Sequence, residues 1–274
     1  MSLQAHGISI TYESSNGRKK TAISDIDLTI RSGEFVSIIG PSGCGKSTLL
    51  HCMGGMLAPT AGRVTVNDVE VKGPNPAQAA FVFQDYSLFP WKNVVDNVSI
   101  GLRFSGIDRH TRRNKAMEQL ELVGLADVAN VYPMELSGGM QQRVAVARAL
   151  TMEPDILLMD EPFGALDEQS RRRLGIEVSQ ILTAAGKTVV MVTHSLDESI
   201  FWADRVLVMS KGPGRIIEDL AVKEVRPRSL EFMTTAEFDT QRVELFRLME
   251  REYEVPVMLA RTTAEPSGFM SGKR

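Results

Sequence analysis

A glycine-rich segment at residues 40–47 constrains the fold of this chain more than any other feature, and it directly follows an apolar run. Its residues are Gly40, Pro41, Ser42, Gly43, Cys44, Gly45, Lys46 and Ser47. Small residues at this spacing let successive backbone N–H groups turn around a phosphate, and a following helix adds its positive N-terminal end. The pattern predicts a phosphate-binding loop between a strand and a helix. A glycine-rich turn that matches by chance is the alternative, which both neighbours disfavour.

Short apolar runs alternate with segments of helical period along the chain, which is typical of an α/β core with a mainly parallel sheet. The runs that predict buried strands are residues 35–39, 80–83, 156–159, 188–192 and 206–209. Alternating residues in the first thirty positions and at residues 62–73 favour a small antiparallel sheet beside that core.

Three segments have the periodicity of amphipathic helices. Their predicted apolar faces are Ala116, Leu120 and Val123 before Gly124, then Leu174, Val178, Ile181, Leu182 and Ala185 before Gly186, and finally Leu245, Leu248 and Met249. The first helix belongs to an expected helical insertion at about residues 85–150. The third belongs to an extension at residues 223–274, whose small, polar end we expect to be disordered.

The composition excludes several classes of protein. With 274 residues, 43% of them hydrophobic and 24% charged, the chain can bury a sizeable core. A net charge of -3 provides no bulk basic field for nucleic acid, and no apolar run is long enough to span a membrane. Residues 1–7 lack the features of a secretory signal, so we expect a cytoplasmic location in which Cys44 and Cys52 stay reduced.

Two acidic residues, Asp160 and Glu161, end the apolar run at residues 156–159. Burying them is costly unless they face a cation or water, and in a parallel sheet this strand end lies near the phosphate-binding loop. We expect Asp160 and Ser47 to hold magnesium, Glu161 to orient an attacking water and Lys46 to reach the β- and γ-phosphates. The alternative is a carboxylate that caps the turn at Pro162.

Residues 136–141, here called the signature segment, lie between the phosphate-binding loop and the acidic pair and precede a predicted helix. Their sequence, Leu-Ser-Gly-Gly-Met-Gln, resembles the signature of ATP-binding-cassette ATPases. The resemblance implies that Ser137, Gly138 and Gly139 contact the γ-phosphate of ATP held by the opposite subunit. Met140 departs from the glutamine common at that position, and a Ser-Gly-Gly run on its own is usually only a helix cap.

Four more positions match the same family in order and spacing. The resemblance implies that Tyr12 stacks on adenine, Gln84 contacts magnesium and senses a membrane partner, Asp167 bridges subunits, and His194 contacts the γ-phosphate. Thr48 is expected beside the nucleotide. Taken singly, Gln84 could be a surface glutamine, Asp167 after Leu166 a helix N-cap, His194 a satisfied strand-end histidine and Tyr12 a packing residue of the small sheet.

The resemblance covers about residues 3–220 and implies a P-loop NTPase core, with residues 1–222 forming an ATPase domain that uses ATP and Mg²⁺. It also implies a head-to-tail homodimer, an integral membrane permease subunit and a solute-binding protein that acts through the complex. No nucleic acid partner is expected. The location implied is the cytoplasmic face of a bacterial inner membrane.

Residues 84–91 and 213–216 resemble the branch that imports nitrate, sulfonates, taurine and similar small solutes. Two alternatives remain open. A soluble, non-transport cassette ATPase of DNA repair or translation is disfavoured because the chain has one cassette and no long coiled-coil pattern. A nucleotide-sensing regulator without turnover is disfavoured because Glu161 and His194 are both present.

Overall fold

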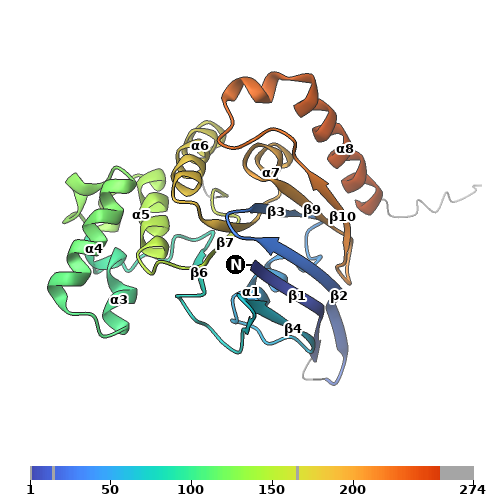
Figure 1. Cartoon of the computed structure of the whole chain (residues 1–274), viewed down its shortest axis with the longest axis horizontal. Coiled ribbons are helices and arrows are strands. Elements are labelled where there is room, and N and C mark those ends of the chain that lie inside the picture. Colours follow the sequence, from blue (N-terminus) through green and yellow to red (C-terminus); the bar gives the residue numbers. More distant parts are fainter. Residues whose placement is uncertain (1, 14–15, 165–166, 254–274) are drawn as a thin grey trace, which may run out of the picture.

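The structure is a computed structural model that describes residues 2–13, 16–164 and 167–253. Two β-sheets form its centre (Figure 1). The smaller sheet has the order β2-β1-β4-β5 and is antiparallel, as the alternating residues predicted. Its strands are β1 (Ser2–Glu13), β2 (Lys19–Arg31), β4 (Ala61–Val66) and β5 (Val69–Glu70).

The larger sheet has the order β10-β9-β3-β8-β7-β6 and is parallel except for its antiparallel edge strand β10. Its strands are β3 (Phe35–Ile39), β6 (Ala79–Val82), β7 (Ile156–Asp160), β8 (Thr188–Val192), β9 (Arg205–Met209) and β10 (Ile216–Ala221). All five predicted strands are present. β6 differs slightly, because it begins one residue earlier and ends before Phe83.

Both faces of the larger sheet are covered, which explains why its strands are apolar throughout. On β3, Phe35 and Ile39 face one buried cluster while Val36 and Ile38 face the other, as the two-residue period of a strand requires. One face carries α6 (Glu168–Ala184), α7 (Leu196–Trp202) and α8 (Ala236–Tyr253), and the other carries α1 (Lys46–Met53) and the smaller sheet (Figure 1).

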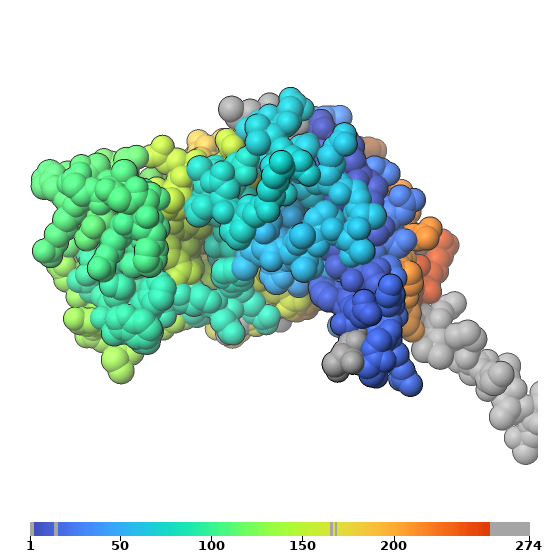
Figure 2. Space-filling view, turned by 90° about the horizontal axis from the view of Figure 1, so that it is seen from below, coloured from blue at the N-terminus to red at the C-terminus, as the bar shows by residue number. Residues whose placement is uncertain are grey.

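The helical insertion is confirmed and lies at one end of the elongated molecule (Figure 2). Its elements are α2 (Val94–Val98), α3 (Ile100–Phe104), α4 (Arg109–Leu122), η1 (Ala126–Val128), η2 (Pro133–Glu135) and α5 (Gly138–Leu150). The predicted face of Ala116, Leu120 and Val123 is buried in a core of the insertion's own. α5 also sends Ala145 and Ala149 into the main core, so it joins the insertion to the larger sheet.

The predicted apolar face of α6 is correct except at one residue. Leu174, Val178 and Leu182 are buried, and Ile181 packs against them. Ala185 is exposed because it is the C-cap, beyond the last helical turn, and Gly186 follows with a φ of 59°.

The extension after residue 222 contains η3 (Leu230–Thr234) and α8, and α8 packs on the main core. Leu245 is buried, and Leu248 and Met249 are partly buried beside it, as predicted. The end that we expected to be disordered lies outside the described residues. None of the described helices combines the length and apolar composition that a bilayer span requires.

Candidate functional site

The phosphate-binding loop joins β3 to α1, as the glycine-rich segment predicted. Gly43 and Gly45 have φ angles of 75° and 107°, which favour glycine. Gly45 is also the N-cap of α1, and a Cβ atom there would overlap the side chain of Ile23 on β2. The conformation of the loop therefore depends on its glycine backbone angles and on its close contact with the smaller sheet.

Lys46 is buried inside the curve of this loop. Its Nζ donates hydrogen bonds to the carbonyl oxygens of Gly40 at 2.8 Å and Pro41 at 3.0 Å. Carbonyl oxygens satisfy the donors of an ammonium group without neutralising its charge. The positive charge therefore remains available at the point where the loop turns and α1 begins.

A cavity of about 790 Å³ opens beside the loop and is here called the phosphate-loop cavity. Its lining residues are Tyr12, Lys20, Thr21, Ala22, Ser42, Gly43, Gly45, Lys46, Ser47, Thr48, Glu161, Lys211, Gly212 and Pro213. Eight of the predicted site residues thus meet here, from Tyr12 to Glu161. The volume is within the usual range for a small-molecule site, about 300–1,000 Å³.

Six lining residues were not predicted. Lys20, Thr21 and Ala22 belong to β2, whose alternating pattern shows only a strand, and the others are Lys211, Gly212 and Pro213. Residues 213–216 did resemble one branch of the family, but nothing in their spacing indicates a phosphate contact. The tertiary structure places these six residues at the cavity, and no local motif predicts that position.

Tyr12 lies near the end of β1 with 46% of its surface exposed. Its hydroxyl is 3.5 Å from Thr48 Oγ1 at the start of α1, and its side chain lines the phosphate-loop cavity. This exposure beside the cavity disfavours the alternative that Tyr12 packs within the small sheet. Its position leaves the ring accessible to a planar ligand.

Ser47 and Asp160 lie together although they are far apart in sequence. Ser47 Oγ donates a hydrogen bond of 3.0 Å to Asp160 Oδ1 at the end of β7. Burial raises the pKa of Asp160, the hydrogen bond from Ser47 opposes this rise, and the charge of Glu161 adds to it. A hydroxyl and a carboxylate oxygen are hard ligands of the kind Mg²⁺ prefers, so the pair fits a magnesium site.

Glu161 and His194 meet because β7 and β8 are adjacent. Glu161 Oε2 is 3.4 Å from His194 Nδ1. The backbone of Glu161 has a φ of 43°, and its N–H donates to Val192 O at 2.9 Å. A non-glycine residue held in the left-handed region is uncommon and is concentrated at functional sites. The structure therefore places the His194 imidazole beside the carboxylate of Glu161, which lines the cavity, although His194 itself is not a lining residue.

Gln84 and Asp167 do not line the phosphate-loop cavity. Gln84 is exposed after β6, and its side-chain amide would touch a Cβ atom placed on Gly164. Asp167 is the N-cap of α6 and accepts a 3.0 Å hydrogen bond from Ser170 N, which lowers its pKa. The helix-cap explanation of Asp167 is therefore correct for the single chain, and Leu166 lies outside the described residues.

The signature segment begins α5 at a distance from these residues in the fold. Ser137 is the N-cap of α5, and its Oγ accepts a 3.4 Å hydrogen bond from Met140 N. Gly138 and Gly139 form the first turn. Cavity-lining residues come from residues 12–48, 161 and 211–213 of the described chain, so the signature segment contributes none. Met140 packs its side chain against the core of the insertion.

Residues 23–164 match the sequence model of the ABC transporter family. The chain belongs to this family. An uncharacterized ABC transporter ATP-binding protein of Methanocaldococcus jannaschii is 44% identical, over 86% of this chain and 87% of that protein. The taurine import ATP-binding protein TauB of Rhizobium johnstonii is 44% identical, over 82% of this chain and 85% of that protein.

Solved ABC transporter structures agree with the fold. A dimeric ATP-binding cassette in a post-hydrolysis state, bound to ADP and phosphate, has a TM-score of 0.70 and 32% identity, covering 81% of this chain and all of that one. The cbiO1 protein of Clostridium perfringens, part of the cbiONQ transporter complex, has a TM-score of 0.72 and 26% identity, covering 92% and 98%. The chain is accordingly an ATP-hydrolysing ABC transporter subunit, and the non-transport alternative is not supported.

Proposed function

We propose that the phosphate-loop cavity binds ATP with magnesium and that the chain uses its hydrolysis to power import of a small solute. The observation that carries this proposal is the convergence of three features on one cavity. They are the ammonium of Lys46, the Ser47–Asp160 pair and the Glu161–His194 pair. Phosphoryl transfer requires these elements: positive charge, a metal site and a group that orients water.

The residues of this site have separate roles in hydrolysis. Backbone N–H groups of the loop and the Lys46 ammonium bind the phosphates and offset their negative charge. The Glu161 carboxylate accepts a hydrogen bond from the attacking water and directs its lone pair at the γ-phosphorus. His194, 3.4 Å from Glu161, contacts the γ-phosphate and keeps the carboxylate in position. Ser47, Asp160 and Gln84 would hold a magnesium ion, which would supply further charge neutralisation when bound.

Two chains form the complete site in this proposal. The phosphate loop and the signature segment are both anion-binding helix starts, yet only the loop lines the cavity of its own chain. A head-to-tail pair places residues 137–139 of one chain against the γ-phosphate held by the other, with Asp167 near the junction. ATP then favours the closed dimer, and hydrolysis reopens it. The solved relative bound to ADP and phosphate is dimeric, which supports this arrangement.

The membrane partner docks beside Gln84. Trp91, seven residues after Gln84 in the sequence, is 70% exposed, and its ring lies 5.6 Å from that of Phe89. Exposed aromatic side chains of this kind suit a protein interface. We assign this surface to an integral membrane permease subunit, which would hold the chain at the cytoplasmic face of the membrane. A solute-binding protein acts on the far side of the same complex.

The solute belongs to the taurine, sulfonate or nitrate class. The relatives include taurine import proteins from several bacteria, and residues 84–91 and 213–216 resemble that branch. We also assign residues 1–222 to the ATPase domain and residues 223–274 to a separate C-terminal extension.

The test is to tag the chain, solubilise native membranes in mild detergent and identify what co-purifies by intact mass. We expect a multi-span membrane protein in equal proportion, lost in a Trp91→Asp variant. Met134→Asp is the matched control, since Met134 is a similarly exposed apolar residue elsewhere on the insertion. Recovery with ribosomes, DNA or no partner would contradict the transporter assignment, and equal loss in both variants would contradict the docking surface.

A further inference from the structure

The loop between β9 and β10, residues 210–215, forms one wall of the phosphate-loop cavity and is here called the β9–β10 loop. Lys211, Gly212 and Pro213 line the cavity together with Lys20, Thr21 and Ala22 of β2. The loop closes on itself through a 3.0 Å hydrogen bond from Arg215 N to Ser210 Oγ. Its position therefore helps to set the width of the cavity.

The β9–β10 loop contacts the phosphate-binding loop and β2 directly. Gly214 N donates to Ala22 O at 2.8 Å, and Ser24 N donates to Gly214 O at 3.0 Å. A Cβ atom on Gly214 would overlap the carbonyl oxygen of Cys44. Because the three segments touch backbone to backbone, a shift of the β9–β10 loop reaches the phosphate-binding loop.

The C-terminal helix α8 holds the other side of this loop. Lys211 N donates a hydrogen bond of 2.7 Å to Glu252 Oε2 in the last turn of α8. A bond from a backbone N–H to a carboxylate is charge-assisted and therefore stronger than a neutral one. Residues of the extension thus contact the cavity wall, although the extension itself contributes no lining residue among those described.

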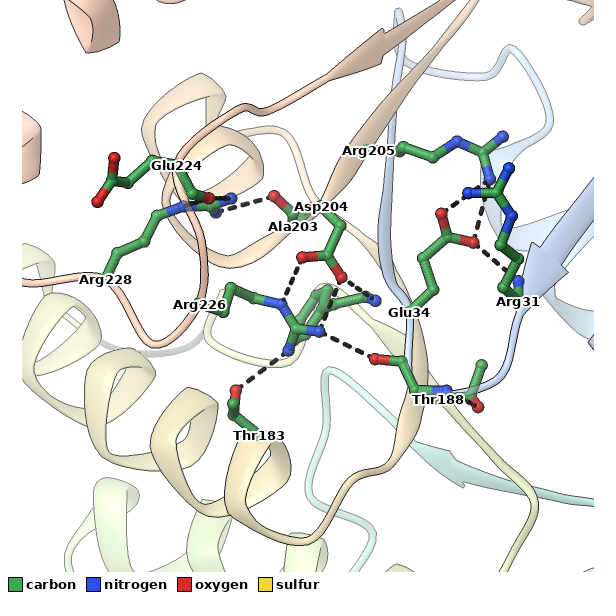
Figure 3. A network of polar contacts seen from close by, with 12 residues as sticks. Arg31, Glu34, Thr183, Thr188, Ala203, Asp204, Arg205, Glu224, Arg226 and Arg228 are labelled. Carbon is green, nitrogen blue, oxygen red and sulfur yellow. Dashed lines mark hydrogen bonds and ion pairs between the residues drawn. The ribbon is translucent and has the colours of Figure 1, made fainter.

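The position of Glu252 is fixed because α8 is held on the main core. Phe238 and Leu245 are buried there, and the Phe238 ring packs edge-on against Phe232 at 5.4 Å. Ahead of α8, Arg228 donates to three backbone carbonyls at the end of α7. Figure 3 shows one of these contacts, with Ala203, and the ion pair between Arg226 and Asp204. Helix α8 therefore provides Glu252 with a rigid support.

We propose that Glu252 is a positioning residue for the nucleotide site: its carboxylate holds Lys211 and the β9–β10 loop in place, so that the C-terminal extension sets the affinity for ATP. This inference rests on the proposed role of the phosphate-loop cavity. It gives the extension a function in the ATPase cycle that does not require the membrane partner.

The negative charge of Glu252 lowers the affinity for ATP, whereas its hydrogen bond to Lys211 raises that affinity. Burial is the main reason why the pKa of Cys44 is raised, and the negative charge of Glu252 adds to that rise, so its field reaches the phosphate-binding loop. A negative charge near that loop weakens binding of an anion such as ATP. Removal of the charge alone and removal of the contact should therefore change ATP affinity in opposite directions.

The experiment compares Glu252→Gln, Glu252→Ala and Glu250→Ala in the full chain, measuring ATP dissociation constants and hydrogen exchange of the Lys211 amide. Glutamine retains an acceptor oxygen but not the charge, so we expect exchange between that of the wild type and that of the alanine variant, with equal or tighter ATP binding. Alanine removes the contact, and we expect faster exchange and a dissociation constant raised about three- to tenfold. Glu250, exposed two residues earlier on α8, is the matched control and should behave as wild type.

Equal or tighter ATP binding by Glu252→Ala would overturn the positioning role and leave only the charge effect. Faster exchange of Lys211 in Glu250→Ala would overturn the specific contact. These results are separable from the cavity assignment. If the wild-type chain fails to bind ATP, or if Lys46→Ala binds it normally, the cavity assignment itself is wrong.

Discussion

The Glu161 side chain owes its position to two strand ends and one unusual backbone conformation. Its N–H bonds to Val192 on β8, its carbonyl accepts from Gly164 N, and its φ of 43° turns the carboxylate out of the sheet. This geometry directs the carboxylate toward His194 and the cavity. Backbone strain of this kind persists only where the surrounding hydrogen bonds enforce it.

Substitution of Glu161 by glutamine separates binding from turnover. The amide has the same size but is a far weaker base, so ATP should still bind while steady-state hydrolysis falls about a hundredfold or more. Nucleotide binding and phosphate release assays measure the two effects. Glu218→Gln, at an exposed position on β10, should leave both unchanged. Normal turnover in the Glu161 variant would remove that residue from the catalytic role.

The raised pKa of Asp160 predicts a magnesium requirement that depends on pH. Burial is the main cause of the shift, so Asp160 takes up a proton at a higher pH than an ordinary aspartate. The protonated carboxyl is a poor metal ligand, and protons therefore compete with magnesium as the pH falls. More magnesium should be needed for half-maximal ATP binding in mildly acidic than in mildly alkaline buffer.

Magnesium titrations of ATP binding across a pH series measure this effect. Asp160→Asn should need more magnesium at every pH and show a much flatter pH dependence. A wild-type requirement that stays constant across the series would contradict metal binding by Asp160.

Among the site residues, those with a fixed spacing were predictable. The loop glycines and Lys46 follow one pattern in eight consecutive residues, and Asp160 and Glu161 follow an apolar strand. Lys20 and Lys211 were not predictable, because Lys20 only ends a short basic run at residues 18–20, Lys211 is an isolated basic residue, and neither belongs to a motif. Their place beside the cavity depends on how β2 and the β9–β10 loop cross the phosphate-binding loop, which is a tertiary contact.

At the scale of elements, Arg228 joins the extension to α7. Its Nη1 donates to the carbonyl oxygens of Ile200 at 2.8 Å, Phe201 at 3.0 Å and Ala203 at 2.8 Å. Figure 3 shows the contact with Ala203. These carbonyls lie at the end of a short helix, where they lack partners within the helix. Burial lowers the pKa of Arg228 to about 10, still well above neutrality, so the guanidinium remains charged.

Arg228→Ala should lower the free energy of unfolding by about 2–4 kcal/mol, because buried carbonyls lose a charged donor. Arg228→Lys should recover part of this loss, since an ammonium can donate to these carbonyls but lacks the planar fork. Urea denaturation of the full chain measures both. Arg247→Ala, at an exposed position on α8, is the control. Equal stability of the Arg228→Ala and Arg247→Ala variants would show that the contact contributes nothing.

Elements with strong periodicity were predicted well. The buried faces of α4, α6 and α8 followed from apolar spacing alone, apart from Ala185 just beyond the end of α6. Sheet order was not predictable, because β3 pairs with β8 and β9, which are more than a hundred residues away along the chain. Long-range pairing depends on the packing of α1 and α6 against opposite faces, and a local pattern does not encode it.

At the scale of the whole molecule, the two anion-binding helix starts belong to different parts of the fold. α1 begins at the cavity of the core, whereas α5 begins in the insertion at one end of the molecule (Figure 1). In a head-to-tail dimer each site would combine the core of one chain with the insertion of the other. Defects in the two parts should therefore complement each other between chains.

Mixing two inactive variants tests whether the chains complement each other. Lys46→Ala disables the phosphate-binding loop, and Ser137→Arg places a bulky cation at the exposed N-cap of α5, so each variant alone should lack ATPase activity. An equal mixture should recover about a quarter of wild-type activity, because half of the dimers are mixed and each holds one intact site. Lys46→Ala mixed with a chain carrying both substitutions is the control and should remain inactive, since neither chain then has a working loop. Absence of recovery in the first mixture, with dimers present, would mean that both helix starts must come from one chain.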